Sequence, residues 1–129
     1  MDINQDFCSY ELSKALKTVG FDEPCIAQWS CEPDGKPLLF GSTAFVFRNA
    51  ELKGRDVTAP LLFHAQKWLR EKHHISVRVS YLSYHKVWFA DWLNLDSGEF
   101  DDTDATFDSY EEALADGISA ALELIKKGE

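Results

Sequence analysis

The sequence has no long apolar run and little cysteine. No apolar stretch approaches the roughly 18 residues that cross a bilayer, so we expect no membrane segment. The first residues, MDINQDF, lack the basic and apolar regions of a secretory signal. The three cysteines, Cys8, Cys25 and Cys31, are odd in number and have no CxxC spacing. These absences predict a cytoplasmic protein with reduced thiols.

Basic residues are absent from a long stretch near the C-terminus. The net charge is -9, with 22 acidic residues against 13 Lys and Arg. Residues 87–125 contain no Lys, Arg or His but hold 11 of the acids, which leaves 11 acids and 13 bases elsewhere, a net of +2. Because contacts to phosphate dominate nucleic-acid affinity, this acidity predicts that nucleic acid is not a partner.

Motifs of nucleotide, metal and nucleophilic chemistry are also missing. There is no phosphate-binding loop and no GxGxxG. His73 and His74 are adjacent, so on a helix they point about 100° apart and cannot hold one ion as an i, i+4 pair does. In the acidic segment Asp96–Asp104, Gly98 is not placed as an EF-hand requires, which leaves only a weak, irregular calcium site as an alternative. We therefore predict no cofactor, no metal and no enzymatic activity.

The chain has a clear helix-to-strand unit at its centre. Thr58 is expected to cap a helix that has Pro60 in its first turn. Apolar residues recur at three-and-four spacing up to Lys72, on one face of this helix. From Ile75 to Tyr81 apolar and polar residues alternate, which predicts a strand with one dry face.

The other segments complete an α+β pattern. In the first half we expect a helix from about Asp6 or Ser9 to Val19, which Gly20 terminates, and strands at 25–29 and 37–47. In the second half we expect a strand at 87–93 that is apolar on both faces and an acidic loop at 99–107. A last helix should run from a capping box at Ser109 to Ile125. The order is α-β-β-α-β-β-α. We predict a single α+β domain over residues 1–129, with a mainly antiparallel sheet of four or five strands packed with three helices.

Three stretches together resemble a known family. They are SYELSKALKTVGFDEPC (Ser9 to Cys25), TAPLLFHAQKWLREKHHI (Thr58 to Ile75) and SYEEALADGISAALELI (Ser109 to Ile125). These stretches are similar to small uncharacterised proteins found in phages and prophages of gut bacteria. The resemblance implies a phage or mobile-element context. That family has no established activity, so no residue role is carried over.

The pattern favours a non-enzymatic protein-binding or assembly module. The candidate partner-binding residues are Trp88, Trp92, Glu99, Asp101, Asp102 and Asp104. The protein partner is unknown, and a homodimer built on the aromatic side chains is one candidate. Two alternatives stay open. One is an acidic mimic of DNA that inhibits a DNA-binding protein, and the other is a small hydrolase or metal site that uses Asp91 and the histidines.

Overall fold

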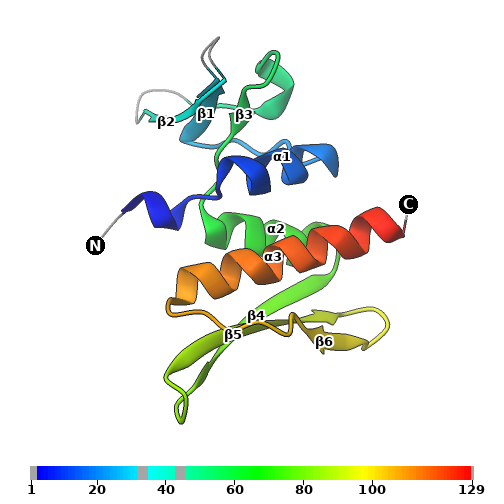
Figure 1. Ribbon diagram of the computed structural model, residues 1–129. Coiled ribbons are helices and arrows are strands. Elements are labelled where there is room, and N and C mark those ends of the chain that lie inside the picture. Colours follow the sequence, from blue (N-terminus) through cyan, green and yellow to red (C-terminus); the bar gives the residue numbers. More distant parts are fainter. Residues whose placement is uncertain (1–2, 32–34, 43–45, 129) are drawn as a thin grey trace. The chain divides into compact units, whose positions relative to one another are not determined.

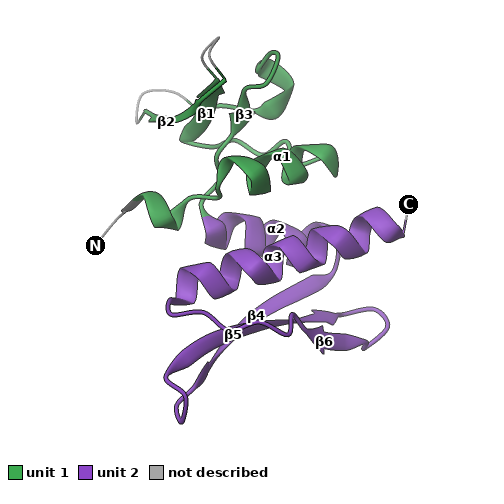
Figure 2. Cartoon of the chain, in the orientation of Figure 1, with its two compact units in different colours: residues 1–61 green, residues 62–129 purple. Residues whose placement is uncertain are grey.

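The protein divides into two compact units, residues 1–61 and 62–129 (Figure 2). The structure, a computed structural model, describes residues 3–31, 35–42 and 46–128. It is an α+β structure whose described part has three α-helices and two three-stranded antiparallel sheets. The expected sheet of four or five strands is therefore replaced by two smaller sheets, one in each unit. That the chain forms one domain stays a prediction.

The first unit combines one α-helix with a small sheet of order β2-β1-β3. Its elements are η1 (Ile3–Asp6), α1 (Tyr10–Thr18), β1 (Ala27–Cys31), β2 (Pro37–Gly41), η2 (Asn49–Glu51) and β3 (Val57–Thr58). Residues 32–36 have proline, aspartate and glycine in turn order, which predicts a tight reversal. This turn and the strand predicted at 37–47 lie partly outside the described residues. Within that strand, Phe47 forms an isolated bridge with Cys25.

Both ends of α1 follow from local sequence. The hydroxyl of Ser9 accepts the backbone N–H of Leu12 at 3.2 Å, which satisfies one unpaired donor of the first turn. Gly20 has a φ of 96°, and the N–H groups of Gly20 and Phe21 donate to the carbonyls of Lys17 and Leu16, both at 3.0 Å. This is a Schellman motif, so the predicted helix end is confirmed.

The predicted helix cap at Thr58 is wrong. Thr58 lies in β3, where it pairs with Gln28 of β1, and it is completely buried. Its N–H donates to Oδ1 of Asn49 at 2.9 Å, while the amide of Asn49 donates to the carbonyl of Phe21 at 2.8 Å. The helix begins four residues later, at Leu62. Pairing with β1 therefore overrides the local tendency of threonine to cap a helix.

The second unit places two helices on one side of a sheet of order β4-β5-β6 (Figure 1). Its elements are α2 (Leu62–Lys72), β4 (Ile75–Leu82), β5 (Val87–Asn94), β6 (Phe100–Asp102) and α3 (Tyr110–Lys127). The two longer strands and both helices occur where the sequence predicts them. The expected acidic loop at 99–107 is in part wrong, because β6 lies within it and makes β5 the central strand.

The absence of a side chain at Gly117 allows α3 to pack closely against the sheet. A Cβ added at Gly117 would lie 2.6 Å from Cγ1 of Val77 and 2.8 Å from Cβ of Ala90, so the helix backbone approaches both strands directly. The predicted helix start at Ser109 is confirmed: Ser109 Oγ accepts the N–H of Glu112 at 3.1 Å. The Glu112 carboxylate accepts the Ser109 hydroxyl at 2.9 Å, whereas in a full capping box it accepts the backbone N–H. Over the described ranges, no helix has the length and apolarity to span a bilayer.

Candidate functional site

One face of the second sheet has no helix of its unit over it. In antiparallel strands, residues directly opposite each other point to the same side of the sheet. Val77 and Ala90 point toward α3, so the alternate residues point away from both helices (Figure 1). We call this side the open face. By register it carries Ser76, Arg78, Ser80, Leu82, Val87, Phe89, Asp91, Leu93, Phe100 and Asp102.

A row of three charged side chains crosses the open face. Arg78 of β4 pairs in register with Asp91 of β5, which pairs with Asp102 of β6. Nε of Arg78 donates to Oδ1 of Asp91 at 2.7 Å, a distance typical of a charge-assisted hydrogen bond. The Asp91 side chain is 22% exposed, as its position on a partly dry face predicts. Since like charges directly opposite each other destabilise a sheet, Arg78 offsets the juxtaposition of the two carboxylates.

Beyond β6 the edge of the sheet forms a bulge. The N–H of Thr103 donates to the carbonyl of Ala90 at 3.1 Å, and Phe107 and Trp88 exchange two backbone hydrogen bonds at 2.8 Å. Three residues, 104–106, therefore stand opposite the single residue Phe89. Asp104 has a φ of 61°, in the left-handed region, and its N–H donates to Oδ1 of Asp102 at 3.0 Å. An aspartate side chain thus fixes the bend.

The bulge borders a shallow, open hollow on the open face. Its volume is about 350 Å³, and it is lined by Leu82, Phe89, Asp102, Asp104, Ala105 and Thr106. The longer strands supply apolar walls through Leu82 and Phe89, while Asp102 of β6 and Asp104 of the bulge supply two exposed carboxylates. Such a mixture suits a group that has an apolar body and a positive end.

Acidic side chains lie along the outer edge of β6. The N–H of Asp102 is accepted by Oδ1 of its neighbour Asp101 at 2.9 Å, so this donor is not offered to an added strand. The charges of the two aspartates disfavour such a strand further. These features favour the face of the sheet and the hollow over the outer edge of β6 as a contact surface.

The structure separates the predicted partner-binding residues into two groups. Trp88 and Trp92 are half-buried on the helix-covered face, where the Trp88 ring lies 4.7 Å from that of Tyr81 and 5.4 Å from that of Tyr110. Four exposed acids, Glu99, Asp101, Asp102 and Asp104, lie around β6. Only Asp102 and Asp104 line the hollow, whereas Asp101 pairs with Trp92 and points to the other side of the sheet.

Sequence reasoning missed the apolar lining of the hollow. The alternation of a strand puts Phe89 on the same face as Val87 and Leu93, but no sequence pattern places it beside Leu82 of β4 or beside Ala105 and Thr106 of the bulge. The sequence signal that could have placed Phe89 beside Leu82 is the tight turn at 83–86, because this turn fixes the register in which β4 pairs with β5.

Most acids of residues 87–125 have no ion pair with the rest of the described chain. Among the described residues, ion pairs join Lys14 to Glu11, His74 to Asp96, Arg78 to Asp91 and Lys126 to Glu123. None of these involves an acid between Glu99 and Asp116. The acids also do not form a single row, because Asp101 and Asp102 point to opposite faces of the sheet.

The groups considered for metal or acid–base chemistry are dispersed. Within residues 3–31, 35–42 and 46–128, no three His, Cys, Asp or Glu side chains are grouped to hold a metal ion. Asp91 meets the Arg78 guanidinium, not an imidazole. Nδ1 of His74 lies 3.0 Å from Oδ2 of Asp96, and the His73 ring packs 4.8 Å from that of Trp68.

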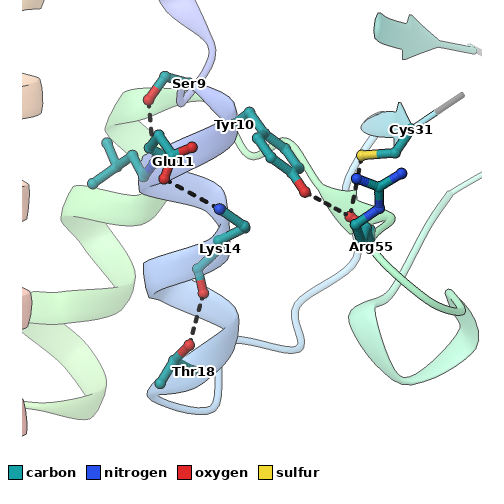
Figure 3. Close-up of polar contacts among 8 residues, drawn as sticks. Ser9, Tyr10, Glu11, Lys14, Thr18, Cys31 and Arg55 are labelled. Atoms are coloured by element: carbon teal, nitrogen blue, oxygen red, sulfur yellow. Dashed lines mark hydrogen bonds and ion pairs between the residues drawn. The ribbon is translucent and has the colours of Figure 1, made fainter. Parts of the chain in front are cut away.

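The thiols of the first unit differ in their surroundings. Burial raises the pKa of Cys25 to about 11 and raises the pKa of Cys8 further. Cys31 is half-buried, and its Sγ lies 3.5 Å from the carbonyl of Arg55, which also accepts the Tyr10 hydroxyl at 3.3 Å (Figure 3). These contacts tie the end of β1 to the segment before β3, and they place no base against a thiol.

Comparison with known proteins identifies no relative. The chain matches no protein-family model, no curated protein and no solved structure. The resemblance to phage and prophage proteins therefore stays a prediction, and function is argued from the geometry of the second unit.

Proposed function

We propose that the protein is a non-enzymatic protein-binding module that contacts its partner through the open face. The observation that supports this is a three-stranded face that the helices of its own unit leave open, on which exposed apolar side chains adjoin Asp102 and Asp104, acids with no ion pair among the described residues. Phe100 is 70% exposed and Leu82 is 37% exposed. Protein interfaces combine such an apolar centre with a polar rim.

The charge of the face indicates the chemistry of the partner. Arg78 and Asp91 neutralise each other, while Asp102 and Asp104 at the hollow have no ion pair within residues 3–31, 35–42 and 46–128. Complementary charge speeds association and selects among partners. The partner is accordingly a polypeptide whose contact surface has basic and apolar side chains.

Selection from a random peptide library tests this proposal. Wild-type protein should enrich peptides that have basic and apolar residues, and Phe100→Ser should weaken their binding because it removes an exposed apolar group outside the hollow. Phe63→Ser is the matched control, since Phe63 on α2 is 63% exposed but does not lie on the open face. Equal losses in both variants, or enrichment of no peptide, would contradict the proposal.

A second candidate is an acidic mimic of DNA. The absence of ion pairs for the acids between Glu99 and Asp116, in the part of the chain that the structure describes, favours it, whereas the division of Asp101 and Asp102 between two faces of the sheet does not. Competition between this protein and duplex DNA for a DNA-binding protein is the measurement. Displacement that is lost when Asp101 and Asp102 are both replaced by asparagine would support mimicry.

A homodimer is a further form that the module can take. The aromatic contact suggested for it has less support, because Trp88 packs against Tyr81 and Tyr110 of its own chain. Light scattering at several protein concentrations measures the assembly state directly.

A further inference from the structure

We propose that the hollow beside the bulge is the binding site for one arginine side chain of a polypeptide partner. This inference rests on the proposed function and names the group that the open face selects. It follows from the shape, charge and rigidity of the hollow.

The size of the hollow suits a single long side chain. Its volume of about 350 Å³ is near the lower end of the range of roughly 300–1,000 Å³ that is typical of small-molecule sites. Leu82 and the Phe89 ring can cover the methylene stem of the guest. A guanidinium also stacks favourably on an aromatic ring, which adds attraction to Phe89.

The two carboxylates favour a guanidinium over an ammonium group. Asp102 uses Oδ1 to accept the N–H of Asp104, and neither residue has an ion pair in the described part of the chain. A carboxylate offers two oxygens to the planar fork of a guanidinium, whereas an ammonium acts as a point charge. On the same face, Nε of Arg78 already lies 2.7 Å from Oδ1 of Asp91, which shows that a guanidinium can be held there by a carboxylate.

The hollow is fixed before any ligand arrives. Ladder hydrogen bonds from Thr103 to Ala90 and between Phe107 and Trp88 hold the bulge on both sides. The hydrogen bond from Asp104 to Asp102 fixes the bend between them. A preformed site loses less conformational entropy on binding, so a short peptide should bind measurably.

An NMR titration tests the assignment with defined probes. The probes are an acetylated, amidated peptide with one arginine between apolar residues, the same peptide with lysine, and N-acetyl-arginine amide. We expect saturable shifts at the amides of Phe89, Asp104 and Thr106, with the arginine peptide binding most tightly. Equal affinity for lysine would overturn the guanidinium assignment, and equal affinity for the free derivative would overturn the assignment to a polypeptide.

Matched variants separate the hollow from general charge attraction. Asp102→Asn with Asp104→Asn removes two charges but keeps the side-chain acceptor at 102, and asparagine tolerates the left-handed backbone at 104. We expect the arginine peptide to lose roughly tenfold or more in affinity, as hydrogen bonds to charged groups are worth about 1.5–3 kcal/mol. Glu99→Gln with Asp101→Asn removes the same charge beside the hollow and should have a much smaller effect.

The outcomes also separate this inference from the proposed function. Equal losses in the two double variants, or no saturable binding of the arginine peptide, would overturn the inference. Library peptides that depend on Phe100 but not on Asp102 and Asp104 would leave the open face as a binding surface and refute the arginine site alone. A retained amide spectrum in each variant shows that the fold is intact.

Discussion

Gly117 of α3 lies so close to Ala90 of β5 that a Cβ at position 117 would stand 2.8 Å from the Ala90 Cβ. In most helices, Gly→Ala stabilises by about 1 kcal/mol because it reduces the entropy of the unfolded chain. Here Gly117→Ala should instead destabilise by about 1–2 kcal/mol, since overpacking a core costs roughly 1–3 kcal/mol. Urea unfolding measures the change.

A second substitution shows whether the cause is steric. The same Cβ would lie 2.6 Å from Cγ1 of Val77, so Val77→Ala should cost less in the Gly117→Ala background than in the wild type. Ser119→Ala is the control, because Ser119 is exposed on the same helix. Additive losses at Gly117 and Val77 would contradict the close approach.

Local signals were enough to predict the longer elements. Ser9, Gly20 and Ser109 fix helix ends through contacts within a few residues, so the sequence alone identifies them. The alternation from Ile75 to Tyr81 likewise reports a strand with one buried face, and the structure has that strand.

Elements that depend on distant partners were missed. Val57–Thr58 and Phe100–Asp102 are strands of two and three residues, and aspartate is a poor strand former. The first becomes a strand because it pairs with β1, and the second because it pairs with β5. No local sequence pattern predicts either pairing. The hollow was unpredictable for the same reason, because its lining comes from β4, β5 and the bulge.

The capping hydroxyl of α3 should contribute measurably to stability. Ser109 Oγ is 3.1 Å from the N–H of Glu112 and 2.9 Å from its carboxylate. Ser109→Ala should lower the free energy of unfolding by about 1 kcal/mol, as loss of an N-cap does. Chemical denaturation gives the value. A loss of the same size in Ser119→Ala, which leaves the cap intact, would show that the hydroxyl is unimportant.

The charged row on the open face predicts a coupling between Arg78 and Asp102. Arg78→Met removes the cation but keeps an apolar stem, and it leaves Asp91 beside Asp102 without compensation. The expected loss is about 1 kcal/mol at low salt, the scale of a partly exposed ion pair. The loss of stability caused by Arg78→Met should be smaller in the Asp102→Asn background, because the repulsion between the carboxylates of residues 91 and 102 is then absent.

A second ion pair shows whether the loss of stability at Arg78 depends on the charged row or only on the removal of a charge. Lys126 lies 3.9 Å from Glu123 on exposed parts of α3, so Lys126→Met should change stability by less than about 0.5 kcal/mol. Denaturation at low and high salt measures both variants. If the two losses were equal, or if Asp102→Asn did not reduce the loss at Arg78, the proposed coupling would be refuted.

Buried thiols predict a loss of stability in alkali. Burial raises the pKa of Cys25 from 9.0 to about 11, so the folded state holds its thiol proton more tightly than the unfolded state does. The resulting stabilisation is complete below pH 9 and disappears as pH rises toward 11, with a size of roughly 2–3 kcal/mol. Cys8, which is fully buried and whose pKa is raised further, acts in the same direction.

Comparison of slopes separates this effect from other groups that titrate in alkali. Cys25→Ala removes the titrating thiol, so its stability should fall less steeply between pH 9 and 11 than that of the wild type, whatever its stability at neutral pH. Urea unfolding at several pH values measures these slopes. Identical slopes for wild type and Cys25→Ala would mean that burial does not hold the thiol protonated.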